Sequence, residues 1–472
     1  MSALSAREKW AYAVGNIPFA AKDAAFANFV VFYYTQIHGL SGTLAGLAMF
    51  IALSWDAISD PIVGSWSDNF RSRWGRRHPL LVAGGLPTAL LFLALFTPPE
   101  QFGDAGIFLW LLGVSILLRT FLTIYFIPYS AMGAELSTDY DERTIIAKAR
   151  VTMGWLAGMA LPAVAFILFF GPRDGVDGRL VAVNYWHYGV LSALVAGITA
   201  VVCIIGTRSV IPRLPTASPA HKFSWRDPLK DLQMALTNRN FRLSVGANLA
   251  FGMSAGVYTT LSLYLGTYFW EFSADQLAGM VLPTAIATLM AFMALHRLGR
   301  RFDKPHLLAF ASLALALNAL WFLGSRLLGF LPENGHAIIY PLLLLNTGIG
   351  VFMIVSMQVL AASLAADIID EQEMATGKRQ EGVVFAAGAF VQKATTGAGA
   401  LLAGIVIDLS GITGDSVPGS VDTDVLQALG WFTLAMTAGL ALIAFFFNTR
   451  LRLGRKDHHK VRTQLAASTP GD

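Results

Sequence analysis

Long apolar runs alternate with short polar turns along almost the whole chain. A run of about 20 predominantly apolar residues is long enough to cross a bilayer as an α-helix. Twelve runs fit that description, at residues 10–37, 42–67, 80–98, 105–133, 149–171, 187–207, 243–270, 275–297, 306–329, 336–366, 383–408 and 425–448. The pattern therefore predicts an all-α integral membrane protein with twelve transmembrane helices.

The longest polar connection falls in the middle of this series. Residues 208–242 contain the sequence IPRLPTASPAHKFSWRDP, whose prolines and charges suit a linker rather than a helix. We therefore expect an N-terminal six-helix half at 1–207, a cytoplasmic linker at 208–242 and a C-terminal six-helix half at 243–449. The basic tail at 450–472 is expected to be cytoplasmic and disordered.

A short repeat supports the division into two halves. The turn after the second run reads DNFRSRWGRRHP, and the turn after the eighth reads HRLGRRFDKP, residues 296–305. Each places a Gly-Arg-Arg core just before the proline at which the next helix begins. Parallel halves of this kind are typical of twelve-helix secondary transporters with the major facilitator fold. The alternative is that two unrelated basic loops happen to look alike.

The basic residues indicate how the chain is oriented. With the N-terminus inside, 28 of the 34 Lys and Arg residues lie in inner segments, three lie in outer loops and three lie within helices. Positively charged loops stay on the cytoplasmic side. We therefore expect a multi-pass protein of the cell inner (plasma) membrane with both termini in the cytoplasm. The net charge of +4 then reflects topology, and no nucleic-acid partner is expected.

The composition argues for a membrane transporter rather than an enzyme. Hydrophobic residues make up 55% of the chain and charged residues only 14%, compared with roughly 25% charged residues in soluble proteins. The sequence contains no HExxH motif, no Gly-rich phosphate loop and no convincing nucleophile–base spacing. We expect a monomer whose partners are the lipid bilayer and a small-molecule or amphiphilic substrate, with a coupling cation but no cofactor.

Six ionisable residues interrupt the apolar helices near the predicted bilayer midplane. A charged side chain there costs at least about 2.5 kcal/mol. Three acids and three bases cancel, so one interpretation is a neutral cluster that only holds helices together. Buried ion pairs stabilise less well than apolar packing, so we favour a functional role. The six are Lys22, Asp23, Asp56, Asp60, Arg119 and Lys393.

Two of these acids stand out by their spacing. Asp56 and Asp60 are four residues apart and therefore share one face of the second helix. Their oxygens suit a hard cation such as Na⁺, and carboxylates in a partly desolvated site can instead exchange a proton. Thr123, one turn after Arg119, could add a hydroxyl, although threonines in helices often bond to their own backbone. We predict a cation site at Asp56, Asp60 and Thr123, with Na⁺ or H⁺ as the coupling ion and the two acids as metal ligands if it is Na⁺.

Apart from Asp56 and Asp60, the charged residues near the midplane have a net positive charge. There are three bases, Lys22, Arg119 and Lys393, and one acid, Asp23. Arg150 is a further base nearby in the predicted site. An arginine offers a planar fork that matches a carboxylate, sulfonate or phosphate. We therefore predict a substrate with an anionic or zwitterionic head over a neutral disaccharide. The alternative is that Arg119 neutralises Asp23 or an acid of the second helix, which would leave a neutral sugar site.

Less polar residues complete the predicted substrate site. Tyr125 and Phe126 on the fourth helix and Met353 on the tenth are expected to line the part of the site that faces away from the charges.

The basic turns are candidates for a cytoplasmic gate. An acid–base latch that forms in only one state would shift the balance between outward-open and inward-open populations. The alternative is that these bases serve only as topology signals. The residues assigned to the gate are Asp68, Arg71, Arg76, Arg77, Arg300 and Arg301.

Several longer stretches resemble the glycoside–pentoside–hexuronide:cation symporter family over nearly the whole chain. The matching stretches are YYTQIHGLS, WDAISDPIVGSWSD with RSRWGRR, IPYSAMGAELSTDYDERT, ADIIDEQEMATGKRQEG and FVQKATTGAGA. The resemblance implies a major facilitator fold and cation-coupled uptake of a sugar or glycoside. It also implies cation carboxylates at Asp56 and Asp60, a hydroxyl at Thr123, a coupled lysine at Lys393 and a basic residue on the sugar side at Arg150.

The chain departs from that family's pattern in the substrate region. Phe126 stands where an acid is expected before the Ile-Pro of the fourth helix, the acid of the first helix falls near Ala20, and Met353 replaces an aromatic residue. Asp23 lies one turn from Ala20 and could substitute for that acid. The substrate pocket is therefore expected to be more apolar than is typical of the family. Sodium-dependent lysophospholipid symporters share the acids and the lysine, so a lysophospholipid or another amphiphile is the alternative substrate.

Overall fold

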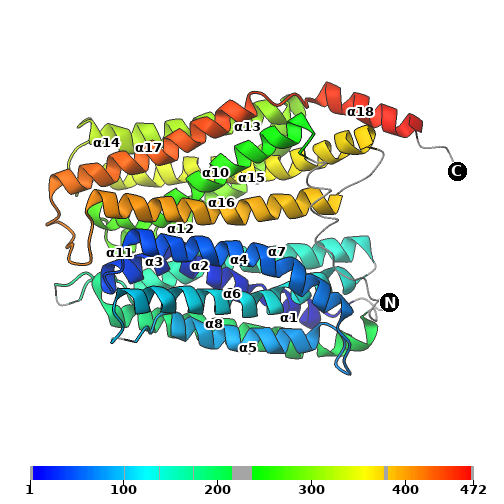
Figure 1. Ribbon diagram of the computed structural model, residues 1–472, viewed down its shortest axis with the longest axis horizontal. Coiled ribbons are helices and arrows are strands. Elements are labelled where there is room, and N and C mark those ends of the chain that lie inside the picture. Colours follow the sequence, from blue (N-terminus) through cyan, green and yellow to red (C-terminus); the bar gives the residue numbers. More distant parts are fainter. Residues whose placement is uncertain are drawn as a thin grey trace.

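The computed structural model describes residues 4–99, 101–137, 139–173, 175–214, 236–376 and 381–468. Within these residues the regular structure is helical, apart from one isolated backbone pair between Arg173 and Val176. The helices run roughly parallel to the long axis of the molecule, and α1 (Ala6–Val14) and α18 (Arg455–Ser468) lie toward the same end (Figure 1). We call this the terminal end; the loops 38–41 and 411–422 lie at the opposite end.

The first group of helices, here called the N-terminal bundle, accounts for the first six predicted runs. The run predicted at 10–37 is divided, because Pro18 begins a new helix near Asn16 and the backbone departs from helical geometry at Phe29. The helices are α1 (Ala6–Val14), α2 (Ile17–Asn28), α3 (Val30–Phe32) with the π-helical turn η1 (Tyr33–Ile37), α4 (Gly42–Asn69), α5 (His78–Leu95), α6 (Asp104–Glu135), α7 (Tyr140–Leu168) and α8 (Ala182–Gly206), with short 3₁₀ turns at η2 (Gly178–Leu180) and η3 (Arg208–Arg213).

The second group, the C-terminal bundle, accounts for the other six. Its helices are α10 (Arg239–Tyr264) with η4 (Leu265–Phe269), α11 (Ala274–Ala278), α12 (Val281–Arg301), α13 (Lys304–Ala319) with η5 (Leu320–Gly324), α14 (Ser325–Leu327), α15 (Ile339–Thr376), α16 (Glu381–Ser410) and α17 (Thr423–Asn448). Residues 215–235 of the predicted linker lie outside the described residues, so the domain boundaries of the sequence analysis stay predictions.

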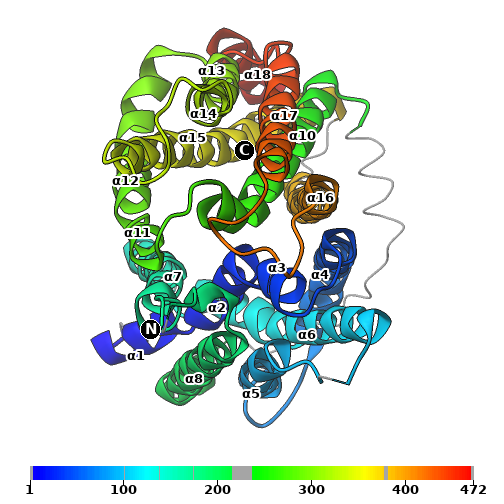
Figure 2. The same ribbon diagram turned by 90° about the vertical axis from the view of Figure 1, so that its left-hand side faces the viewer.

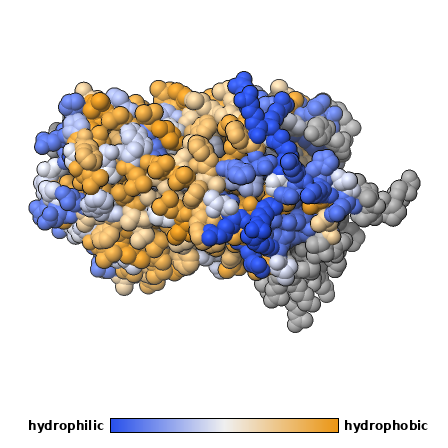
Figure 3. All heavy atoms as spheres, turned by 90° about the horizontal axis from the view of Figure 1, so that it is seen from above, coloured by the Kyte–Doolittle hydropathy of each residue, from blue (hydrophilic) through white to orange (hydrophobic). Residues whose placement is uncertain are grey.

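Ten of the described helical segments are long and apolar enough to cross a membrane. The other two predicted spans are helical as well. The first is broken into short helices, and α10 carries polar residues such as Asn240, Ser244 and Asn248 that lower its hydropathy. The prediction of an all-α membrane protein is confirmed. In Figure 3, hydrophobic side chains cover the middle of the face that is seen, and hydrophilic ones gather toward the end that carries the C-terminus.

The structure differs from the sequence prediction in the C-terminal tail. Part of the tail that was expected to be disordered forms α18 (Arg455–Ser468). Arg455 donates hydrogen bonds to the carbonyls of Gly299 and Arg300, which lie at the end of α12. The His458 ring nitrogen Nε2 lies 3.0 Å from Oδ2 of Asp370 on α15. These contacts order a segment whose composition alone suggested disorder.

The two bundles contact each other at the opposite end, which faces the viewer in Figure 2. There α4 packs against α16 with almost no side chain between them, since a Cβ added at Gly404 would lie 2.0 Å from the Gly42 carbonyl oxygen. Asp408 accepts hydrogen bonds from the backbone N–H groups of Gly42 (2.6 Å) and Thr43 (2.8 Å), at the start of α4. A carboxylate at a helix N-terminus satisfies free donors and the helix dipole, so Asp408 ties the bundles together.

Candidate functional site

A buried ion pair lies at the centre of the charged residues. Arg119 on α6 donates through Nη1 to Oδ2 of Asp56 on α4 over 2.7 Å, and the two side chains are only 3% and 8% exposed. The guanidinium also lies over the ring of Phe26, 4.6 Å from its centroid. This is the alternative role that the sequence left open for Arg119, because its charge is neutralised by an acid of the second predicted helix.

Asp60 is paired with the C-terminal bundle. Its Oδ2 bonds to Nζ of Lys393 on α16, and Thr123 donates its hydroxyl to Oδ1 over 3.0 Å. Lys393 also lies 3.9 Å from Oδ2 of Asp56. The side chains of Lys393 and Asp60 are 28% and 29% exposed. The predicted grouping of both acids with Thr123 and Lys393 is present, and the Asp60–Lys393 pair is its accessible half.

A second pair lies on the first predicted helix. Lys22 is bonded to Asp23, and its side chain is only 5% exposed whereas that of Asp23 is 55% exposed. The Lys22 ammonium lies 4.3 Å above the ring of Phe19, which stacks on Phe126. A carboxylate cannot face lipid without a large cost. We therefore expect the open side of Asp23 to face water rather than lipid, next to the apolar stack of Phe19 and the predicted residue Phe126.

The other predicted substrate residues have local partners. Arg150 donates to the hydroxyl of Ser130 over 2.8 Å, and its carbonyl accepts from Asn16, so it links α7 to α6 and to the start of α2. Met353 is partly buried and packs against an apolar cluster that includes Phe251 and Leu360. A role for either in binding stays a prediction.

A multidentate metal centre is not formed by the described side chains. Among them, no group of three or more His, Cys, Asp or Glu residues is placed to hold a metal ion. The oxygens available to a cation are those of the two acids and of Thr123. Such hard oxygen ligands suit Na⁺ better than a transition metal, so a cation site there stays a prediction that the donor chemistry permits.

Sequence reasoning missed three aromatic or acidic neighbours of these charges. Phe19 and Phe26 lie under Lys22 and Arg119, and Glu135 pairs with the basic turn that follows α4. The i,i+3 spacing of Phe19 to Lys22 is visible in the sequence. The partners of Phe26 and Glu135 lie far away along the chain, and only the packing of α2, α4 and α6 brings them together.

The basic turn after α4 forms a network within the N-terminal bundle. Arg77 bonds to Glu135 at 2.6 Å, Asp68 at 2.8 Å and the Ser67 hydroxyl at 2.5 Å, and Arg76 bonds to the same glutamate at 2.7 Å. Burial alone would lower the pKa of Arg77, but the hydrogen bonds to Glu135 and Asp68 outweigh it and raise the pKa. Arg77 thus bonds to the predicted partner Asp68 and, at a shorter distance, to Glu135.

The corresponding turn of the C-terminal bundle is held differently. Arg300 and Arg301 are exposed, as is Arg71 in the first turn. The ion pair at this turn is formed by Lys304, whose Nζ lies 2.6 Å from Oδ2 of Asp367 on α15. The bases predicted for the gate therefore divide into paired and solvent-exposed ones, and a gating role for any of them stays a prediction.

Replacing Arg77 by glutamine is expected to destabilise the terminal end of the N-terminal bundle. The change removes charge-assisted hydrogen bonds from a side chain that is 3% exposed, at a cost of about 2 kcal/mol. We expect a melting temperature several degrees lower for the purified protein in detergent. Arg71→Gln is the matched control at an exposed position of the same turn. Equal melting temperatures for the two variants would contradict a bracing role for Arg77.

The chain also matches a family of known proteins. Residues 11–455 match the family described as MFS/sugar transport protein. The inner membrane symporter YicJ of Escherichia coli is 24% identical over 98% of this chain and 95% of its own. The isoprimeverose transporter of Lactiplantibacillus pentosus is 20% identical over 93% of this chain and 88% of its own.

Solved structures agree on the fold. The xylose transporter XylE of E. coli, in an inward open conformation, superimposes with a TM-score of 0.60 over 97% of this chain and 98% of its own, at 13% identity. The predictions of a major facilitator fold, of a transporter rather than an enzyme and of a multi-pass membrane protein are therefore confirmed. The chain belongs to the MFS/sugar transport protein family, among its glycoside–pentoside–hexuronide:cation symporters.

Proposed function

We propose that the protein is a cation-coupled symporter that carries a sugar or glycoside across the bacterial inner membrane by alternating access. The observation that carries the proposal is the bond between Lys393 of α16 and Asp60 of α4, which joins the two bundles inside the apolar part of the molecule. The family and its sugar-transporting members support the substrate class. No cofactor and no partner subunit are part of the proposal.

The coupling step follows from competition for one carboxylate. Lys393 supplies the positive charge that Asp60 needs while no cation is bound. A bound Na⁺, with Thr123 as a further oxygen ligand, or a proton on the carboxylate would release the lysine. Because Lys393 belongs to the other bundle, its release would weaken the contact between bundles. Cation binding would thereby bias the conformational equilibrium, as coupling requires.

We further propose that the terminal end faces the cytoplasm and that this conformation opens inward. Contacts between the bundles concentrate at the opposite end, where Thr35 bonds to Tyr264, Tyr268 donates to Gln36 and Asp408 caps α4. The ion pairs described at the terminal end join residues within one bundle. The distribution of Lys and Arg supports the same orientation.

The pairing of the charges favours an uncharged sugar. The expectation of an anionic head rested on a positive surplus, but Arg119, Lys22 and Lys393 each bond to an acid. A substrate anion would have to displace a carboxylate that is already in place. An exposed carboxylate such as Asp23 accepts hydrogen bonds from sugar hydroxyls. Acidic glycosides and lysophospholipids are therefore the competing substrates for the test.

Uptake into proteoliposomes tests this function. Radiolabelled methyl glycosides of galactose, glucose, xylose and glucuronic acid, and a lysophospholipid, would be offered under an inward Na⁺ gradient, an inward proton gradient or neither. We expect accumulation of at least one neutral glycoside that depends on one of the gradients. Uptake of the lysophospholipid alone, or of the glucuronide alone, would contradict the proposed substrate class.

A further inference from the structure

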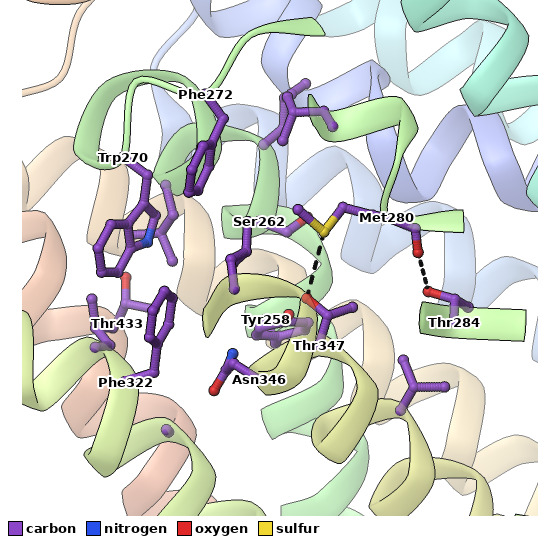
Figure 4. Close-up of a pocket in the computed structure, with 18 of the residues that line it drawn as sticks. Tyr258, Ser262, Trp270, Phe272, Met280, Thr284, Phe322, Asn346, Thr347 and Thr433 are labelled. Carbon is purple, nitrogen blue, oxygen red and sulfur yellow. Dashed lines mark hydrogen bonds between the residues drawn. The ribbon is translucent and has the colours of Figure 1, made fainter. Parts of the chain in front are cut away.

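A cavity of about 280 Å³ lies within the C-terminal bundle, apart from the charged cluster. Helices α10, α12, α13, α15 and α17 provide most of its wall, and Asn28 and Phe166 close it from the N-terminal bundle. Figure 4 shows the side chains that surround it. Ligand sites typically begin at roughly 300 Å³, so the volume suits one ring with its substituents.

The wall combines aromatic faces with hydrogen-bond acceptors. Trp270 stacks on Phe322 with ring centroids 4.4 Å apart, and Phe272 lies beside them (Figure 4). The hydroxyls of Ser262 and Thr284 donate to carbonyls of their own helices, which leaves their lone pairs free. Such a wall suits an apolar or aromatic ring that carries hydrogen-bond donors.

One buried polar atom of the described cavity wall lacks a hydrogen-bond partner. The Asn346 side chain belongs to this wall, its residue is 9% exposed, and among the described atoms its Oδ1 has no hydrogen-bond donor. Buried acceptors are nearly always paired. A donor on a ligand in the cavity would satisfy it. None of the described residues that line the cavity is Asp, Glu, Lys, Arg or His, which favours an uncharged occupant.

The cavity lies within reach of the charged cluster. Along α2, Asn28 is five residues beyond Asp23, a rise of about 7.5 Å. Along α10, Tyr258 is six residues, or about 9 Å, beyond Gly252, which packs against Thr395 near Lys393. Measured along either helix, the cavity is displaced by a similar distance from the charged cluster toward the opposite end. A solute of two linked rings would span this separation.

We propose that this cavity is the aglycone subsite of the transporter, and that it binds an uncharged apolar or aromatic ring attached to the sugar. The inference rests on the proposed function and names its substrate class: a glycoside with a hydrophobic aglycone. The sugar lies beside Asp23 and the aglycone lies within the C-terminal bundle. A substrate bound in this way contacts both bundles and therefore responds to their relative movement.

Competition by matched glycosides tests the subsite. For each sugar of the panel that is transported, the methyl and phenyl glycosides compete with the labelled solute. We expect the phenyl glycoside to inhibit at a concentration about tenfold lower in the wild type. Ser262→Phe fills the cavity and should abolish that advantage without changing inhibition by the methyl glycoside, whereas Ser262→Ala should keep it.

Two outcomes would overturn the subsite. Equal inhibition by both glycosides in the wild type excludes it without any variant, so a misfolded Ser262→Phe cannot hide the answer. A phenyl advantage that survives Ser262→Phe places the ring elsewhere. If that second outcome comes with a changed thermal stability in lipid, a lipid chain occupies the cavity instead. If no sugar of the panel is transported, the proposed function is refuted. That result differs from the outcomes above, in which a sugar is transported but the phenyl group gives no evidence of a subsite.

Discussion

Asp60→Asn is expected to abolish accumulation of substrate against its gradient while leaving exchange of substrate across the membrane. An asparagine has nearly the same shape as the aspartate, and its Oδ1 can accept the hydrogen bond from the Thr123 hydroxyl. It carries no charge, so it can neither bind a cation as a carboxylate does nor form an ion pair with Lys393. Accumulation should fall from about tenfold under a tenfold cation gradient to none. Uptake and equilibrium exchange in the same proteoliposomes separate the two effects.

Two further variants sharpen this result. Asp415→Asn is the matched control, because Asp415 is exposed in the loop between α16 and α17, and it should behave as wild type. Asp56→Asn should in addition lower stability by about 3–5 kcal/mol, because it leaves the buried Arg119 without its acid. Gradient-driven accumulation by Asp60→Asn at the wild-type level would exclude Asp60 from the cation site.

Gly404→Ala is expected to hold the opposite end open. The new Cβ would lie 2.0 Å from the Gly42 carbonyl oxygen, so α4 and α16 must separate and the hydrogen bonds of Asp408 to the start of α4 must lengthen. Closure of this end is one half of the transport cycle. The variant should therefore transport at least about tenfold more slowly, since 1.4 kcal/mol of disfavoured closure has that effect.

Labelling of a cysteine at the contact measures the opening directly. Ala45 on α4 is fully buried, and the natural Cys203 is buried as well, so Ala45→Cys offers one site that reports exposure. A membrane-impermeant maleimide should label it faster when Gly404→Ala is also present. Gly158→Ala is the control, because a Cβ there meets nothing within 4 Å while it gives the same gain in helix propensity. Equal labelling rates in the two backgrounds would contradict the prediction.

Much of the fold could be predicted from the sequence, because a bilayer restricts what a chain can do. Apolar runs of about 20 residues identify helices almost by themselves. The cost of charges in hydrocarbon likewise identified Asp56, Asp60, Arg119 and Lys393 as a group before their contacts were known. The structure places these four together.

The sequence could not predict which acid each base would bond. The pairing of Arg119 with Asp56, and of Lys393 with Asp60, depends on the rotation of α4, α6 and α16 about their axes. Apolar periodicity is a weak guide to rotation when lipid and protein interior are equally apolar. The cap that Asp408 provides to α4 was missed for a similar reason, because its two parts are 366 residues apart.

The shape of the C-terminal cavity was also beyond the sequence. Most of the predicted substrate residues are charged or match the family's pattern, and they lie mainly on α2, α6 and α7. None of the described residues that line the cavity is charged, and they include residues such as Thr347 and Val351 that are ordinary in an apolar helix. Only the packing of five helices leaves the space between them.

The zero-flux gradient tests cation-coupled symport most directly. Wild-type proteoliposomes would be prepared with a fixed tenfold cation gradient, Na⁺ or H⁺ in separate series, with the membrane potential held at zero. Net flux of the transported glycoside would then be followed over a range of substrate gradients. If one cation moves with each substrate, net flux should vanish at about a tenfold inward accumulation for the coupling cation. Net flux that vanishes at equal substrate concentrations in both series would show that neither Na⁺ nor H⁺ drives transport, which contradicts the proposed coupling.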